Sequence, residues 1–180
     1  MFMTLKNRLP ALSQILSIFG VIALLLYGWT LLWFFWKLPS WEYFMNLGEI
    51  ATQVAYMMAT NLLESLTVLF LMLFLCAVLP AKWFKDFFLS SGASLAILSL
   101  GYMMYFSSHI ASNDDNYPTN MVRLVPLAGL LILLLAYFTA RVGFMRRLLE
   151  GLADRAMIFS YIFLPAGLVS LLVVIVRNIL

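Results

Sequence analysis

A single carboxylate, Glu64, lies inside a long apolar stretch of the chain, in the segment TNLLESLTVLF. Three other polar side chains, Thr60, Asn61 and Thr67, lie three or four residues away from it. This spacing places side chains on one face of an α-helix. Carboxylate and hydroxyl oxygens can bind a proton or a small cation, or can hydrogen-bond to a neighbouring helix. The pattern therefore predicts a polar site at Thr60, Asn61, Glu64 and Thr67 within apolar surroundings.

Two interpretations of the Glu64 site stay open. A carboxylate in an apolar medium is costly, so we expect Glu64 to point into a helical bundle and to hydrogen-bond there. A protonated Glu64 would join two helices, which contributes about 0.6 to 2 kcal/mol per hydrogen bond in a membrane. Alternatively, Glu64 exchanges a proton or binds a cation during transport. No other charged residue lies well inside an apolar stretch, so a proton relay has no second member and the structural interpretation is favoured.

A second polar cluster occurs in the segment SSHIASNDDNYPTN, which contains His109, Asp114 and Asp115. Oxygen-rich clusters of this kind bind hard cations such as Ca²⁺ or the amine of a lipid headgroup. The segment lacks the central glycine and terminal glutamate of a complete calcium loop. It also shows a loose similarity to the acidic pairs of metal-dependent enzymes that act on lipid-linked substrates. We interpret it as a solvated turn and keep the cation or headgroup site as an alternative.

The composition is that of an integral membrane protein. Of 180 residues, 64% are hydrophobic and 11% are charged, whereas about 25% of residues are charged in soluble domains. The single cysteine, Cys76, cannot form an intrachain disulfide, and no cysteine and histidine cluster of zinc-binding type occurs. Sequence motifs of hydrolases, zinc proteases and nucleotide-binding loops are also absent. We therefore expect no cofactor, no metal and no catalytic residues.

Five stretches approach the roughly 20 apolar residues that cross a bilayer as a helix. The sequence thus predicts an all-α fold, a bundle of five transmembrane helices that forms a single domain over residues 1–180. The predicted spans are 13–36, 51–79, 88–107, 122–142 and 157–177. In the third span, Gly92, Ala96 and Ser99 share one face and predict a close-packing surface of small residues. We expect this surface to pack against the second span, where Glu64 lies.

The basic residues predict how the chain is threaded, because loops on the cytoplasmic side carry an excess of lysine and arginine. With the N-terminus inside and the C-terminus outside, eight of the 11 basic residues lie inside and three lie outside. The inner ones are Lys6, Arg8, Lys82, Lys85, Arg141, Arg146, Arg147 and Arg155, and the outer ones are Lys37, Arg123 and Arg177. We expect a multi-pass protein of a bacterial or archaeal cell membrane.

The short loops and the lack of a second buried charge favour a noncatalytic subunit that stabilises, positions or regulates a larger integral membrane complex. Its expected partners are membrane lipids and other integral membrane subunits. No nucleic acid is expected, because the positive charge is explained by residues at the inner membrane face. One alternative is a small transporter or channel-forming subunit with Glu64 as its proton or cation site. The other is a membrane enzyme that acts on a lipid-linked substrate through the outer cluster.

Overall fold

A computed structural model describes residues 10–79, 84–112 and 119–179, and all the regular structure within them is helical. Five helices are long and apolar enough to cross a bilayer, which confirms the predicted all-α bundle of five spans. They are α2 (Leu12–Trp41), α3 (Leu47–Val78), α4 (Phe88–Ser112), α5 (Thr119–Arg141) and α6 (Gly143–Ile179). A short 3-10 helix, η1 (Lys85–Phe87), leads into α4.

The ends of two helices show how local sequence sets their length. α3 begins directly after Asn46, whose side-chain oxygen accepts a hydrogen bond from the backbone N–H of Glu49. In return, the Glu49 carboxylate accepts a hydrogen bond from the backbone N–H of Asn46. This reciprocal pair satisfies amides that a helix start leaves without partners. α6 begins at Gly143, well before the predicted span 157–177. The segment GFMRRLLEGLADRAM is rich in good helix formers, so it continues into the apolar span without a break.

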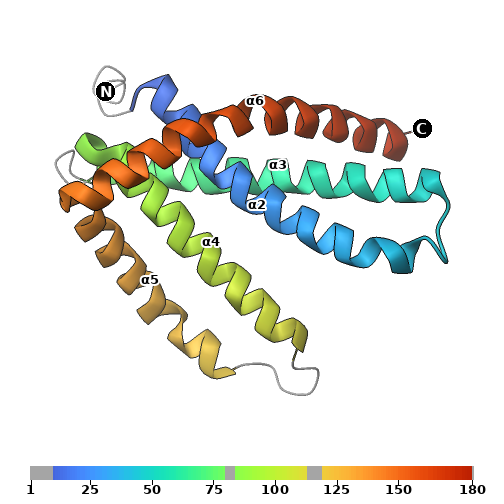
Figure 1. Ribbon diagram of the computed structural model, residues 1–180, viewed down its shortest axis with the longest axis horizontal. Helices are drawn as coiled ribbons and strands as arrows, with labels where there is room; N and C mark the ends of the chain where they lie inside the picture. The colour runs from blue at the N-terminus through green and yellow to red at the C-terminus, as the bar shows by residue number, and fades with distance from the viewer. Residues whose placement is uncertain (1–9, 80–83, 113–118, 180) are drawn as a thin grey trace.

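α6 packs against all four other long helices, and α2 packs against α3, α4 and α6 (Figure 1). The expected packing of the second span on the third is wrong: α4 packs against α2, α5 and α6 and scarcely touches α3. The small-residue face of α4 meets α2 instead, since a Cβ atom on Gly92 would lie 3.1 Å from Ile18. α4 and α5 lie side by side and diverge from α2 and α3 towards the loop that joins them (Figure 1).

Two glycines allow α6 to cross close to its neighbours. A Cβ atom on Gly20 of α2 would overlap the backbone carbonyl of Ala156 in α6. A Cβ atom on Gly167 of α6 would lie 2.6 Å from the Tyr27 hydroxyl. That buried hydroxyl donates to the Met58 carbonyl of α3 at 3.1 Å and lies 3.5 Å from the Phe163 carbonyl of α6. Tyr27 therefore joins the three helices α2, α3 and α6 at one point.

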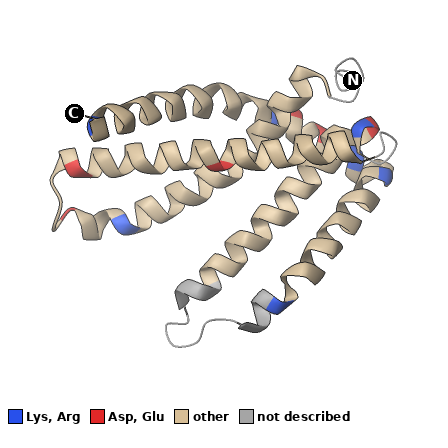
Figure 2. Cartoon of the chain, turned by 180° about the vertical axis from the view of Figure 1, so that it is seen from behind, with Lys and Arg blue, Asp and Glu red and all other residues tan. Residues whose placement is uncertain are grey.

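The charged residues lie mainly at the ends of the helices (Figure 2). α3 and α5 end, and α4 and α6 begin, at the same end of the bundle (Figure 1). We call it the basic end, because it holds the basic residues of η1, of the end of α5 and of the first part of α6. These residues are Lys85, Arg141, Arg146, Arg147 and Arg155. Lys37, Arg123 and Arg177 belong to the helix ends far from it. That the basic end faces the cytoplasm stays a prediction.

Candidate functional site

A lateral groove lies where α4 diverges from α2 and α3. It consists of two adjoining hollows, of about 510 Å³ and about 380 Å³, which share Trp29 of α2 and Ser107 of α4. The larger hollow contains Glu64, and the smaller one contains Lys37. The acidic position in the middle of α3 is far from the charged positions at the helix ends (Figure 2). The groove therefore brings one isolated carboxylate to the edge of the bundle.

The side chains of the predicted polar site on α3 point in two different directions. Thr60, Glu64 and Thr67 all line the larger hollow, because offsets of four and three residues keep side chains within about 60° on a helix with 3.6 residues per turn. Asn61 is buried in the bundle, where its Oδ1 accepts a hydrogen bond from the Thr30 hydroxyl of α2 at 3.0 Å. The sequence pattern placed the four residues on one face, and the structure separates Asn61 from the other three.

The expectation that Glu64 points into the centre of the bundle is wrong. Its side chain is exposed at the groove wall. Its threonine neighbours do not donate to it. The Thr60 hydroxyl donates to the Tyr56 carbonyl at 2.9 Å, and the Thr67 hydroxyl donates to the Leu63 carbonyl at 2.8 Å. Each hydroxyl proton is thus used within α3, while the lone pairs of each oxygen can still accept. This wall is rich in acceptors, and the chemistry that complements it is a hydrogen-bond donor or a cation.

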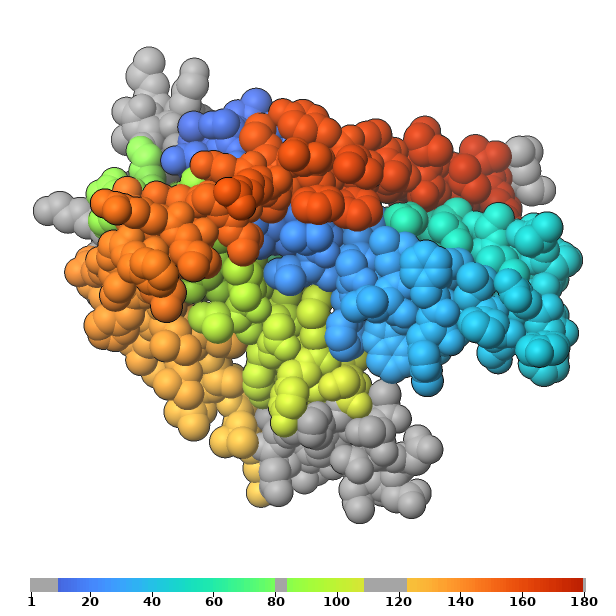
Figure 3. Space-filling model, in the orientation of Figure 1, coloured from blue at the N-terminus to red at the C-terminus, as the bar shows by residue number. Residues whose placement is uncertain are grey.

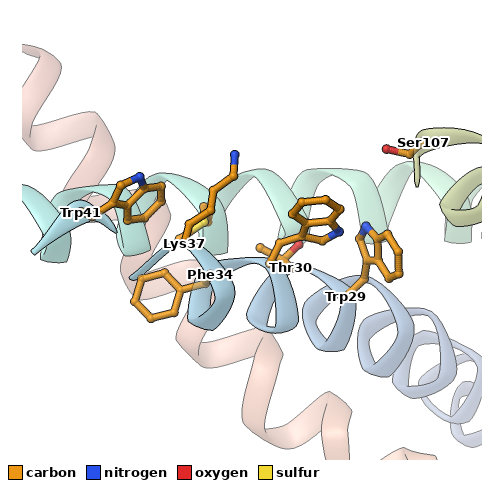
Figure 4. Close-up of a pocket in the computed structure, with 8 residues that line it drawn as sticks. Trp29, Thr30, Phe34, Lys37, Trp41 and Ser107 are labelled. Carbon is orange, nitrogen blue, oxygen red and sulfur yellow. The ribbon is translucent and has the colours of Figure 1, made fainter. Parts of the chain in front are cut away.

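The smaller hollow has an aromatic wall on α2. Trp29, Lys37 and Trp41 project to the same side of the helix, with Ser107 of α4 beyond Trp29 (Figure 4). The Lys37 ammonium lies 5.9 Å from the centre of the Trp33 ring, a distance at which a cation is attracted to the face of an aromatic ring. Tryptophan and lysine are typical of the membrane interface. The groove thus runs from an interfacial aromatic region to a carboxylate midway along α3.

No known protein-family model, curated protein or solved structure matches this chain.

The other predicted site residues lie apart from the groove. Gly92 and Ala96 are buried in the bundle, and the Ser99 hydroxyl donates to the Leu95 carbonyl of its own helix at 2.6 Å. His109 belongs to the last turn of α4 rather than to a loop. Asp114 and Asp115 lie outside the described residues. Within the described parts of the chain, no group of three or more histidine, cysteine, aspartate or glutamate residues is placed to hold a metal.

Sequence reasoning missed the contribution of α2 and α4 to the groove. These helices contribute Trp29, Met103 and Ser107 to the larger hollow, beside Glu64. Their positions in the sequence carry no signal that they lie near Glu64, because their proximity depends on how α2, α3 and α4 are arranged in space. The one available signal was the cluster of tryptophans in the second half of the first span.

Proposed function

We propose that this chain is a noncatalytic membrane subunit that stabilises or positions a larger integral membrane complex. The observation that supports the proposal is the sideways orientation of Glu64 into a groove at the edge of the bundle. Acyl chains offer no hydrogen-bond donors, so lipid in the groove leaves a carboxyl group unsatisfied. A helix of a partner subunit can supply the donor and cover the apolar part of the groove.

The groove also indicates the chemistry of that partner helix. Its deep wall consists of acceptor oxygens from Thr60, Glu64 and Thr67. A lysine, arginine, asparagine or glutamine side chain at the same depth would complement them. A polar contact of this kind across membrane helices is specific, because each group is costly in lipid without the other. The apolar wall, which includes Leu63, Met103 and other large side chains, would pack against the same helix.

The proposal predicts how substitutions at Glu64 change assembly. Glu64→Gln keeps an acceptor at nearly the same volume and should retain the partner. Glu64→Leu leaves the partner's donor unsatisfied, which costs about 1 to 3 kcal/mol and weakens association about 5- to 150-fold. The chain would be purified from its native membrane in a mild detergent, and the mass of the assembly measured. Glu42→Leu is the matched control, because Glu42 is exposed at the end of α2, outside the groove.

Two outcomes would contradict the proposed subunit role. If wild-type protein is found only as copies of itself, there is no larger complex for it to stabilise. If Glu64→Leu retains a heteromeric partner as well as Glu42→Leu does, the groove is not the interface.

The second candidate function is a small transporter or channel-forming subunit in which Glu64 binds a proton or cation. The same acceptor-rich wall favours it, since oxygens are the ligands that small hard cations prefer. Here the glutamine variant is decisive, because an amide cannot titrate. Glu64→Gln that assembles normally and loses transport activity would replace the structural role with the ion-binding one.

A further inference from the structure

The first half of α6 carries arginines in two different environments. Arg146 is engaged: its Nε donates to Glu150 at 2.8 Å, and its guanidinium lies 4.9 Å from the centre of the Phe87 ring. Arg147 and Arg155 are exposed, and within the described parts of the chain neither forms an ion pair. Two positive charges at the basic end are thus left without an acidic partner from the described residues.

Arg147 and Arg155 line one cavity of about 500 Å³. They lie eight residues apart on α6 with Gly151 midway between them, so the three positions follow one side of the helix. A Cβ atom on Gly151 would meet no atom of the described residues within 4 Å, so these residues leave the space between the two arginines open. A volume of this size is within the range of about 300 to 1,000 Å³ that ligand pockets occupy.

The cavity continues from the arginines to an apolar wall. This wall includes Phe159 and Ala156, further along α6, and Leu24 of α2. α6 crosses over α2 and α4 on the face shown in Figure 3, so the wall lies where two membrane helices meet. Towards Phe159 the cavity enters the apolar span, and towards Arg147 it approaches the basic end. One cavity therefore has a cationic part towards the basic end and an apolar part within the predicted span.

We infer that this cavity binds an anionic phospholipid, with the phosphate of the headgroup between Arg147 and Arg155 and an acyl chain against Leu24 and Phe159. Guanidinium groups match phosphate oxygens in charge and in hydrogen-bond geometry. Basic pockets between membrane helices bind such headgroups on the cytoplasmic side of membranes. Free phosphate would use the arginines alone and would leave the apolar wall uncovered. The inference is independent of the Glu64 groove and of the proposed subunit role.

The test is a lipid-binding measurement on the purified full chain by native mass spectrometry. Phosphatidylglycerol is titrated against phosphatidylcholine with the same acyl chains. We expect the wild type to prefer phosphatidylglycerol, and Arg147→Gln and Arg155→Gln each to weaken its binding about fivefold, with about thirty-fold for the double variant. Arg141→Gln is the matched control: Arg141 lies at the same end of the bundle, but its guanidinium is stacked 4.1 Å from the centre of the Tyr137 ring. The control should change binding less than about twofold.

Three results would overturn the inference. Equal binding of the two lipids would remove the role of the headgroup charge. An equal loss in Arg141→Gln would indicate general attraction to a positive surface rather than a site. Competition by inorganic phosphate at the concentration of the lipid would indicate a bare phosphate site without an acyl chain. Arg147→Lys and Arg155→Lys keep the charge and should retain most of the binding, which separates a lost site from a misfolded protein.

Discussion

The crossing of α2 and α6 at Gly20 gives the sharpest test of the fold. A Cβ atom on Gly20 would lie 2.7 Å from the carbonyl carbon of Ala156, and closer still to its oxygen. These are backbone atoms of another helix, so no side chain can rotate to make room. Gly20→Ala therefore has to push α6 away from α2 along the most extensive helix contact of the bundle.

The expected loss of stability in Gly20→Ala follows from a comparison with Gly28, a second glycine of the same helix. Alanine is better than glycine within a helix by about 1 kcal/mol, and this gain is common to Gly20→Ala and Gly28→Ala. At Gly28 an added Cβ would meet nothing within 4 Å among the residues that the structure describes. The difference between the two variants is therefore the cost of the overlap, about 1 to 3 kcal/mol for overpacking. In a chain of this length that cost lowers the melting temperature by about 2 to 12 °C.

The single cysteine provides the assay. Cys76 is 1% exposed, so a thiol-reactive dye reports unfolding as the temperature is raised in detergent. Gly28→Ala should melt at or above the wild-type temperature, and Gly20→Ala should melt clearly below Gly28→Ala. If the two variants melt together, α6 does not cross α2 at Gly20 and the helix arrangement described here is wrong.

Two further predictions concern a buried hydroxyl and the threading of the chain. Ser65 is fully buried, and none of the described residues forms a hydrogen bond with its Oγ. Ser65→Ala should therefore raise the same melting temperature, since an unsatisfied buried group costs about 1 to 3 kcal/mol. A lower melting temperature would indicate a partner for this hydroxyl in the native membrane. Cysteines introduced near Asp114 in a cysteine-free background should be labelled from outside intact cells, and cysteines near Arg146 only after permeabilisation. Labelling of both from outside would refute the predicted orientation.

The sequence predicted the number of spans because bilayer thickness dictates the length of an apolar helix. It did not predict the start of α6, since a search for apolar residues cannot detect a charged helix that continues into a span. The sequence also did not predict which helices pack against one another. Gly92 signals a close contact, but only the position of Ile18 in α2 identifies the neighbour.

The sequence predicted only part of the candidate site, because it does not show which side chains face a neighbouring helix. Periodicity alone grouped Thr60, Asn61, Glu64 and Thr67, because all four recur at helical offsets. Which of them face the bundle depends on where α2 lies against α3. Thr30 of α2 binds Asn61, and this contact joins residues 31 positions apart in the chain. Sequence spacing within one helix carries no information about it.

The length of α6 has a consequence for the surrounding lipid. α6 has 37 residues, which corresponds to about 56 Å, against about 30 Å for the hydrocarbon core of a bilayer. Only Val142 separates it from the end of α5, so the charged first part of α6, which includes Arg147 and Arg155, begins beside the end of α5. The helix has to tilt or curve to keep these charges out of the hydrocarbon core.

Close contacts at Gly20 and Gly167 fix that tilt from within the protein. A single free helix adapts to a thicker or thinner bilayer by changing its inclination. This bundle cannot do so without breaking those contacts, so the lipid has to stretch or compress around it. The melting temperature should then depend on acyl-chain length, with one optimum, when the protein is placed in bilayers of defined thickness. In a membrane of uneven thickness, elastic mismatch alone would concentrate the protein where the bilayer matches it.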